Sequence, residues 1–581
     1  MAAATSSRTH KMREEFDQLG ILTRHFFRRL FRNDIVDFED QMKERLIALL
    51  AILAIFIGWS SHLLAENYLF LPDNNQSWQE KTYIFTLMMV LFGIITVLEW
   101  DVLFLDRRDF ISLRPLPIRL RTLFCAKLAS LIMFVGLFSI AMNSVSSFIF
   151  ASYLADWRSK SLGFAVRYVV AHILSSFAAC FCVFFACIFL QVFLMAGLPY
   201  KIYLRISPLV RLVLIAALVF TLMALIIQPS LLGSSFNSLA GLKDKEAPFI
   251  FLFPPLWFSG LYEVLLGTHD PLFVIQAKMA GLALLISLAA FILASGLSYC
   301  RHTLKTLEAK KGGRPKLFWL REHVAETLQN AILWSPEERA VASFFSKTIR
   351  ASPKHLMTLT NYVAVAASFI LLFVIVNRQS FRMLVPENAM LLAQPLILSI
   401  VLLAGLRAVA DIPAAPEARW VFQVTETIRR IRYISGLKKA IFFKWFLPLS
   451  ALVFLSHLIL WRDWRSAFNH AIFGLTVSSV GIEAFFYRFR KIPFACTNVP
   501  GKLKLQTRGI PYLLGFIALL AVLSNIEMGL LRKPSYFWVF FVLSAISWVL
   551  LRMNSARFLK TNPLIYEEEP EPAMIVFPGN V

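Results

Sequence analysis

Charged residues are scarce in this sequence: Asp, Glu, Lys and Arg make up only 16% of its 581 residues, while 58% are hydrophobic. A soluble protein of this length could not cover its surface with so few charges. Hydrophobic runs of about twenty residues recur along the whole chain, and each is long enough to cross a bilayer as a helix. The sequence therefore predicts an all-α, polytopic integral membrane protein and argues against a soluble or singly anchored one.

Cysteine is also sparse, with six residues in the chain. All six lie in predicted spans or on the predicted cytoplasmic side, so we expect no disulfide framework. Cys180, Cys182 and Cys187 share one apolar helix that lacks polar partners for a metal site, so we expect them to pack in the core. The ten histidines show no metal-ligand spacing. We therefore expect this chain to hold no metal or cofactor.

The motifs of common catalytic sites are missing as well. No stretch fits the phosphate-binding pattern G-x-x-x-x-G-K-[ST], and neither H-E-x-x-H nor a Ser-His-Asp signature is found. The first 45 residues are charged throughout and have no apolar stretch before a cleavage site, so they do not predict a signal peptide. We expect that the chain is not an enzyme and does not hydrolyse ATP.

The excess of basic residues has a simple explanation in a multi-pass protein. The net charge is +23, but no segment has the pattern of a nucleic-acid-binding module, so we expect no nucleic acid as partner. If both termini are cytoplasmic, most of the 59 Lys and Arg residues fall in cytoplasmic segments, as the positive-inside rule requires. The charge distribution therefore predicts the orientation.

Twelve segments fit a membrane-spanning helix, in two groups of six. In the first half they are residues 46–64, 83–104, 123–150, 164–197, 209–232 and 272–299. In the second half they are residues 357–376, 388–409, 441–461, 467–487, 510–526 and 535–552. The expected domains are an N-terminal arm (1–45), a first six-helix half (46–299), a basic linker (300–356), a second half (357–552) and a tail (553–581). In each half, basic loops follow the second and fourth spans, so the halves repeat in topology and charge.

Two further segments have a character of their own. Residues 16–31 place apolar side chains at helical spacing and arginines every fourth residue, which predicts an amphipathic helix lying in the inner headgroup layer or packed on a cytoplasmic partner. Residues 247–266 are apolar but interrupted by Pro254 and Pro255, which predicts a re-entrant or interfacial segment on the outer side. In the linker, residues 319–350 have helical character.

The loop after the second span carries the most specific pattern. Asp106-Arg107-Arg108-Asp109-Phe110 is followed by Leu113-Arg114-Pro115-Leu116-Pro117 and then by Ala126-Lys127-Leu128. With these residues the chain resembles the permeases of type 2 ATP-binding-cassette (ABC) exporters, where an acidic and basic cluster, a Pro-Leu-Pro-like turn and an Ala-Lys-Leu start of the third span follow one another. That family also has an amphipathic elbow helix before its first span and re-entrant outer helices between its fifth and sixth, the places of residues 16–31 and 247–266.

The resemblance implies a permease in a fused, double-length form, resident in the bacterial cytoplasmic (inner) membrane. A separate ABC ATPase subunit, expected in two copies, would bind ATP and magnesium and drive an exporter whose substrate is unidentified. The many Phe residues suggest an amphipathic substrate. The implied ATPase-coupling residues are Asp106, Arg107, Arg108, Asp109, Phe110, Leu113, Arg114, Pro115 and Pro117.

A loop of this kind would couple the ATPase mechanically to the membrane-spanning helices. Prolines stiffen the turn, Asp and Arg supply oriented charged contacts, and Phe110 and Leu113 could fill an apolar socket on the ATPase. Alternatively, the same charges only anchor the loop at the inner headgroups. In the second half the matching loop lacks the motif, so an equivalent role there is open. Its candidate residues are Arg407, Asp411, Arg419, Trp420, Arg429 and Arg430, with Arg407 and Asp411 spaced to pair on one helix face.

Ionisable residues within or near the spans raise two other possibilities. These residues are Glu99, Asp101, His172, Lys278, His457 and Glu483. Intramembrane charge often marks a transport path, but Glu99, Asp101 and Glu483 lie near inner span ends, close to Arg107 and Arg488, so we expect structural pairing. An ATP-independent secondary transporter or lipid scramblase is the alternative, and it predicts polar residues converging at the midplane. A membrane-embedded enzyme predicts a catalytic cluster at one membrane face.

Overall fold

The computed structural model describes residues 17–28, 42–66, 78–99, 118, 120–158, 162–227, 249–308, 333, 335–376, 386, 388–426, 429–496 and 505–566. In these residues the chain is almost entirely helical, and one isolated β-bridge joins Lys491 and Ile565. Eleven of the described helical segments are long and apolar enough to cross a membrane. The protein is therefore an all-α, multi-pass membrane protein, as its composition predicts.

The described chain divides into two compact units. Unit 1 contains the described residues up to Glu308, and unit 2 contains those from Leu333 onward. The predicted second span, residues 83–104, corresponds to helix α3 (Trp78–Leu98). The predicted twelfth span, residues 535–552, corresponds to helix α22 (Phe537–Thr561). The sixth span runs further than predicted, because its helix continues to Glu308.

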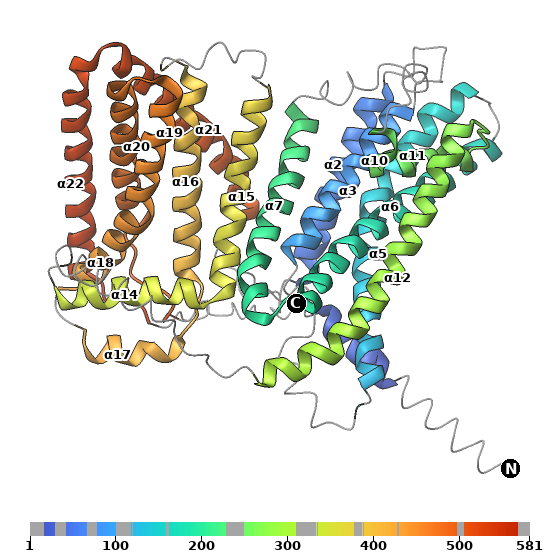
Figure 1. Cartoon of the computed structure of the whole chain (residues 1–581), viewed down its shortest axis with the longest axis horizontal. Helices are drawn as coiled ribbons and strands as arrows, with labels where there is room; N and C mark the ends of the chain where they lie inside the picture. Colours follow the sequence, from blue (N-terminus) through green and yellow to red (C-terminus); the bar gives the residue numbers. More distant parts are fainter. Residues whose placement is uncertain are drawn as a thin grey trace, which may run out of the picture. The chain divides into compact units, whose positions relative to one another are not determined.

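Unit 1 contains six long helices, a broken pair of short ones and an N-terminal helix at residues 17–28 (Figure 1). The helices are α2 (Met42–Glu66), α3 (Trp78–Leu98), α5 (Leu120–Arg158), α6 (Leu162–Gly197), α7 (Tyr200–Ile227), α10 (Phe249–Leu252), α11 (Pro254–Leu265) and α12 (Pro271–Glu308). Helix α3 is the most enclosed of them, with Phe85, Met88 and Phe92 buried in the core of the unit. Helices α2 and α12 leave many large apolar side chains exposed, as lipid-facing helices do.

The predicted re-entrant segment is a pair of helices too short to cross a bilayer. Helix α10 has 4 residues and α11 has 12, and the chain breaks between them at Phe253. The break follows from Pro254 and Pro255 at the start of α11, where a proline is accepted because the first helical N–H groups need no partner. Helix α11 packs on α12, α3 and α6, so it is buried in protein, where a broken helix is tolerated.

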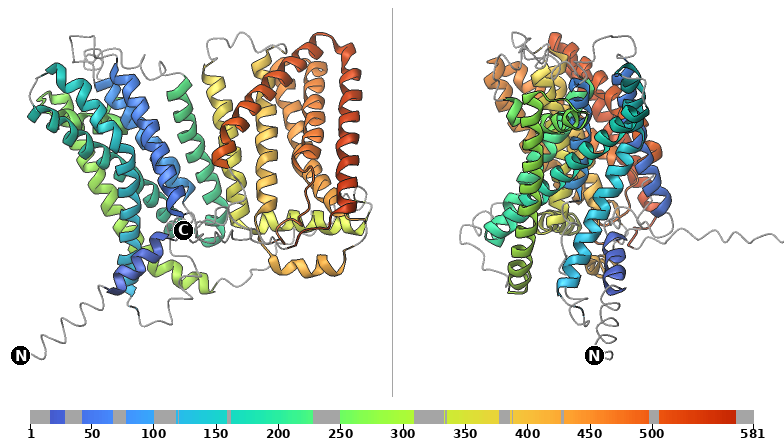
Figure 2. Two further views of the ribbon diagram at one scale, coloured as in Figure 1. Left: turned by 180° about the vertical axis from the view of Figure 1, so that it is seen from behind. Right: turned by 90° about the vertical axis from the view of Figure 1, so that its right-hand side faces the viewer.

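Unit 2 also contains six long helical segments, and they run side by side in Figures 1 and 2. Its elements are α14 (Pro336–Ala351), α15 (Pro353–Val376), α16 (Ala389–Asp411), η4 (Pro416–Ala418), α17 (Arg419–Val424), α18 (Ile431–Ile441), the π-helical turn η5 (Phe442–Phe446), α19 (Leu447–Trp461), α20 (Trp464–Phe485), α21 (Leu505–Arg532), η6 (Pro534–Tyr536) and α22. Helix α18, η5 and α19 form one continuous span, Ile431–Trp461.

The tenth predicted span, residues 467–487, is helix α20. It is not among the eleven apolar segments, although its 22 residues reach about 33 Å at 1.5 Å per residue. Two of its ionisable side chains, His470 and Glu483, are buried inside unit 2, where partners within the protein meet them. A span enclosed by other helices does not need the apolar surface that lipid demands.

Helix α14 crosses the end of unit 2, roughly perpendicular to α15 and α16 (Figure 1). Its apolar side buries Val341, Phe345 and Ile349, while the Ser335 hydroxyl caps its start by accepting a hydrogen bond from the Glu338 backbone N–H at 3.3 Å. Part of the predicted helical stretch 319–350 is thus confirmed, and residues 319–332 lie outside the described residues. Helix α18 packs closely on α14 because Gly436 brings its backbone against Glu338.

Candidate functional site

The predicted coupling residues 106–117 lie outside the described residues, and the structure describes the chain before and after them. Glu99 follows helix α3 on one side, and on the other Ile118 and helix α5 resume the described chain. Ile118 packs against a small apolar cluster formed by Leu22 and Phe26 of the N-terminal helix with Leu123 and Ala126 of α5. The N-terminal helix is therefore seated next to the point where the predicted coupling segment enters the third span.

The N-terminal helix is amphipathic, as its spacing predicts, but its apolar side packs on this chain. Leu22 and Phe26 are buried against α5, and Lys127 of α5 has its Nζ 5.4 Å from the centre of the Phe26 ring. Arg24 and Arg28 are exposed on the other side. The packing on α5 accounts for the buried residues Leu22 and Phe26, while the predicted contact of this helix with headgroups or with a cytoplasmic partner stays a prediction.

The predicted pair of the second-half loop is confirmed. The Arg407 guanidinium donates to the Asp411 carboxylate across one turn of α16, and Lys491 lies 3.8 Å from the other carboxylate oxygen. The guanidinium carbon is also 4.4 Å from the centre of the Phe489 ring. These contacts tie the end of α16 to the segment that follows α20.

The other predicted residues of this loop lie on or near the short helix α17, which crosses below α14 in Figure 1. Trp420 is 63% exposed and Val424 79% exposed, and Arg429 is exposed as well. Arg430 pairs with Glu426 at 2.7 Å. The second half therefore presents an apolar patch, Trp420 and Val424, on a short helix at one end of the spans.

A buried ion pair that our sequence interpretation missed holds the broken segment of unit 1 in place. The Lys81 ammonium of α3 donates to the Glu263 carboxylate of α11, and both side chains are almost fully buried. Its Nζ lies 5.3 Å and 4.6 Å from the ring centres of Tyr168 and Tyr262. One sequence signal could have found it, because Glu263 is the only acidic residue of the apolar stretch 247–266.

His172, the midspan histidine identified in the sequence, belongs to a structural polar chain. Its Nε2 lies 3.2 Å from the Ser146 hydroxyl, which in turn lies 2.8 Å from the Ser61 hydroxyl. The rings of Phe85 and Phe150 stack on it. These polar contacts link α2, α5 and α6 within the core of unit 1, so we interpret them as contacts that hold the helices together.

Unit 2 contains a second buried pair, between α20 and α21. His470 Nδ1 lies 2.5 Å from a Glu527 carboxylate oxygen, and the two side chains are 2% and 0% exposed. The His457 ring of α19 is 4.4 Å from that of His470. We identified His457 in the sequence but missed His470 and Glu527, because neither stands at a spacing that shows the pairing between separate helices.

Glu483 is paired, but with a different partner from the one we expected. Its carboxylate accepts from Lys438 of α18 at 2.5 Å, and both side chains are buried. Arg488 instead lies over the rings of Tyr487 and Phe558, at 5.1 and 5.3 Å. Arg488 has a left-handed backbone conformation just after α20, which turns its side chain toward α22.

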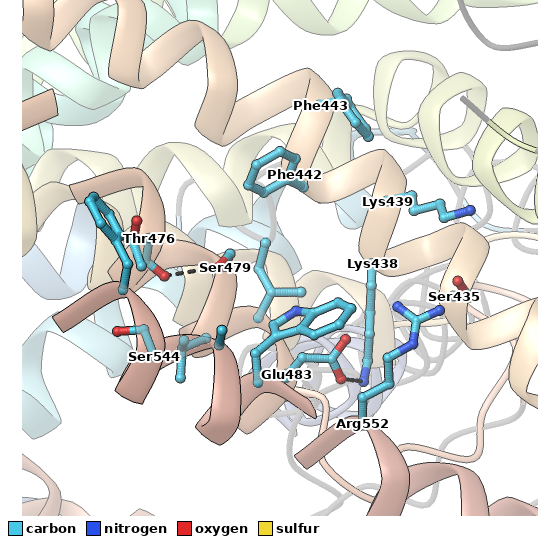
Figure 3. Close-up of a pocket in the computed structure, with 15 residues that line it drawn as sticks. Ser435, Lys438, Lys439, Phe442, Phe443, Thr476, Ser479, Glu483, Ser544 and Arg552 are labelled. Carbon is cyan, nitrogen blue, oxygen red and sulfur yellow. Dashed lines mark hydrogen bonds and ion pairs between the residues drawn. The ribbon is translucent and has the colours of Figure 1, made fainter. Parts of the chain in front are cut away.

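The Lys438–Glu483 pair lies in the wall of a pocket of about 550 Å³ between α18, η5, α20 and α22 (Figure 3). That volume is in the range of small-molecule sites. At one end the pocket is lined by Ser435, Lys438, Lys439, Glu483 and Arg552. The rest of the lining consists of Phe442, Phe443, Phe541 and Trp548 together with Thr476, Ser479 and Ser544, and the Trp548 ring lies next to Arg552. The pocket combines charged, hydroxyl and aromatic side chains, so its lining and size suit an amphipathic ligand.

Comparisons with known proteins and the metal-ligand geometry add two facts. No family model, no curated protein and no solved structure matches this chain. Among the described residues, no group of three or more His, Cys, Asp or Glu side chains is placed to hold a metal ion. Cys180 and Cys182 are buried as free thiols in α6.

Proposed function

We propose that this protein is the permease of an ABC exporter, in a fused double-length form, and that it works with a separate ATPase subunit expected in two copies. The observation that carries the proposal is the helix order of unit 1: an amphipathic helix seated on the third span, six long helices, and a broken short helix pair between the fifth and the sixth. This order is the one that the resemblance to type 2 exporter permeases implies. Hydrolysis of ATP belongs to the partner, together with ATP and magnesium.

The ends of the helices offer a mechanical route for such a partner. In unit 1, the N-terminal helix packs on the start of α5, the span that follows the segment 106–117 in the chain, so force applied to that segment would reach a span. In unit 2, the exposed Trp420 and Val424 of α17 form an apolar surface at the end of the spans that carries α14. We place these two features at the cytoplasmic side of a bacterial inner membrane, with both termini on that side, because the basic clusters lie there.

Co-purification tests the proposal most directly. The full chain, tagged and extracted from its native membrane, should retain a subunit with a phosphate-binding loop, and the complex should hydrolyse ATP in lipid while the chain alone does not. Substitution of Trp420 by Ala should weaken retention, because an apolar anchor on an interface contributes strongly. Robust hydrolysis by the isolated chain, or transport by it without any ATPase, would exclude the two-component arrangement.

One observation favours the alternative of an ATP-independent transporter. The His470–Glu527 pair is a buried, titratable couple between two spans, and such couples serve as proton relays in carriers. The pair lies within two turns of the start of α20 and of the end of α21, away from the middle of the spans. That position is more typical of a structural pair than of a proton relay. Proton-coupled flux through the isolated chain in liposomes, abolished by Glu527→Gln, would favour the alternative.

A further inference from the structure

We propose that the pocket between α18, α20 and α22 binds one anionic phospholipid, with the acidic headgroup at Ser435 and Arg552 and an acyl chain along the aromatic end. The proposal goes beyond the transport function, because it depends only on residues of unit 2. It rests on three observations: the charge left over at one end of the pocket, a buried hydroxyl without a partner, and the order of polar and apolar groups along the helices.

The charges at the polar end do not balance within the pocket. Lys438 is neutralised by Glu483 at 2.5 Å, and Lys439 pairs with Glu338 of α14 at 2.7 Å. Arg552 is left over: among the described residues its guanidinium makes no ion pair or hydrogen bond, and it lies over the Trp548 ring at 4.9 Å. A guanidinium with five free donors in a partly apolar wall is a suitable site for a phosphate group.

The Ser435 hydroxyl supplies the second, independent observation. The residue is only 5% exposed, its oxygen has no hydrogen-bond partner in the described part of the chain, and it lines the same end of the pocket. A buried hydroxyl without a partner is costly, so its presence calls for a ligand or water that completes it. Figure 3 shows Ser435, Lys438 and Arg552 gathered at one end, around the Lys438–Glu483 pair.

The pocket extends along α22 from its charged end, as an acyl chain would. The lining residues of α22 run from Phe541 to Arg552, which are eleven positions apart, or about 16 Å along the helix at 1.5 Å per residue. Arg552 is nearer the end of α22, and Phe541 is near its start, so the charged end lies toward one membrane surface and the aromatic end toward the other. A lipid in a leaflet has the same order of headgroup and chain. Exposed Ala545 in the lining shows that the pocket opens on the surface of the unit, where a lipid can enter from the bilayer.

Lipid retention by the purified full chain provides the test. The chain is placed in nanodiscs that contain equal amounts of phosphatidylglycerol and phosphatidylcholine with identical chains, then extracted in detergent, and the retained lipids are counted by native mass spectrometry. We expect one retained phosphatidylglycerol per chain in preference to phosphatidylcholine, and we expect millimolar inorganic phosphate not to displace it. Displacement by phosphate would instead show a free-anion site and overturn the lipid assignment.

Two variants and a matched control separate this site from general attraction of basic side chains to anionic headgroups. Arg552→Gln should lower the preference for phosphatidylglycerol about tenfold, the size expected for one charged hydrogen-bonded contact. Arg557→Gln, an exposed arginine later on the same helix, should leave it unchanged. Ala545→Phe should lower retention by filling the apolar end while keeping every charge.

Equal loss in the Arg552 and Arg557 variants, or wild-type retention in Arg552→Gln, would overturn the proposal. Failure of the site is also distinguishable from failure of the transport proposal, because retention of the ATPase is measured separately. A chain that loses its lipid and keeps its ATPase, or the reverse, tells the two apart.

Discussion

The ammonium group of Lys81 and the carboxylate of Glu263 form an ion pair inside unit 1, joining the enclosed helix α3 to the broken helix α11. The pair is enclosed by the rings of Tyr168 and Tyr262, and Thr82 beside it donates to the Ser259 hydroxyl at 3.0 Å. Since α11 is only 12 residues long and cannot cross a bilayer, these contacts explain how a short helix stays at membrane depth.

We expect Glu263→Gln to destabilise the protein by about 3–5 kcal/mol, because it leaves the Lys81 charge buried without a counter-charge. The double variant Lys81→Met/Glu263→Gln should recover part of the loss, because it removes both charges. Thermal unfolding in detergent measures both effects, and Lys278→Met, at an exposed lysine of α12, is the control. A single variant that melts with the wild type would show that the pair contributes nothing to stability.

The crossing of α14 and α18 depends on a glycine. A Cβ atom on Gly436 would lie 2.5 Å from the Glu338 carbonyl oxygen and 2.7 Å from its Cα, and backbone atoms cannot move aside as a flexible side chain can. We expect Gly436→Ala to cost about 1–3 kcal/mol, as overpacking does. Gly529→Ala, at a helical glycine with open space around it, should instead be neutral or stabilising. Unfolding midpoints of the two variants would decide, and equal midpoints would contradict the close packing.

The turn between α19 and α20 makes stability depend on acid pH. Asp463 caps α20, and hydrogen bonds from the Ser466 hydroxyl and the Arg465 backbone N–H hold the pKa of its carboxyl below the usual value. A lowered pKa in the folded state gives stabilisation that is complete above the unfolded-state pKa of about 3.9 and is lost as the pH falls below it.

Asp463→Asn keeps the cap and removes this titration. The unfolding midpoint of the wild type should therefore approach that of Asp463→Asn as the pH falls from 6 to 3, while Asp463→Ala should be less stable than Asp463→Asn throughout. Parallel curves for the wild type and the Asn variant over that range would refute the role of the carboxylate.

The predicted coupling segment can be tested by charge reversal. Arg107→Glu/Arg108→Glu should weaken binding of the proposed ATPase by about 2–5 kcal/mol, because buried charged hydrogen bonds at an interface would be lost. Arg429→Glu/Arg430→Glu should cost less, since that loop lacks the motif and Arg430 already pairs with Glu426. The measurement is pull-down of the ATPase at equal amounts of inserted protein. Full retention by the first variant would leave the segment as a headgroup anchor only.

The physical reason that the sequence predicts so much of this fold is the bilayer. In lipid, every backbone N–H and C=O group must be hydrogen-bonded within the helix, and the side chains that meet lipid must be apolar. Each span therefore appears in the sequence as a run of apolar residues, and the proline pair at residues 254–255 appears as an interruption of such a run. The spacing of Arg407 and Asp411 likewise gave their pair, because both residues lie on one helix. Local patterns of this kind need no knowledge of neighbouring helices.

The sequence by itself determined the class of protein, the approximate position of most of the long helices, the amphipathic N-terminal helix and the Arg407–Asp411 pair. Only the tertiary structure decided that Lys81 meets Glu263, that His470 meets Glu527, that Glu483 pairs with Lys438 while Arg488 turns to Phe558, and that Ser435 and Arg552 share a pocket. Each of these pairs joins residues from separate elements, between 45 and 182 positions apart where they form hydrogen bonds. Which faces of two helices meet is set by packing between them, and no single helix carries that information.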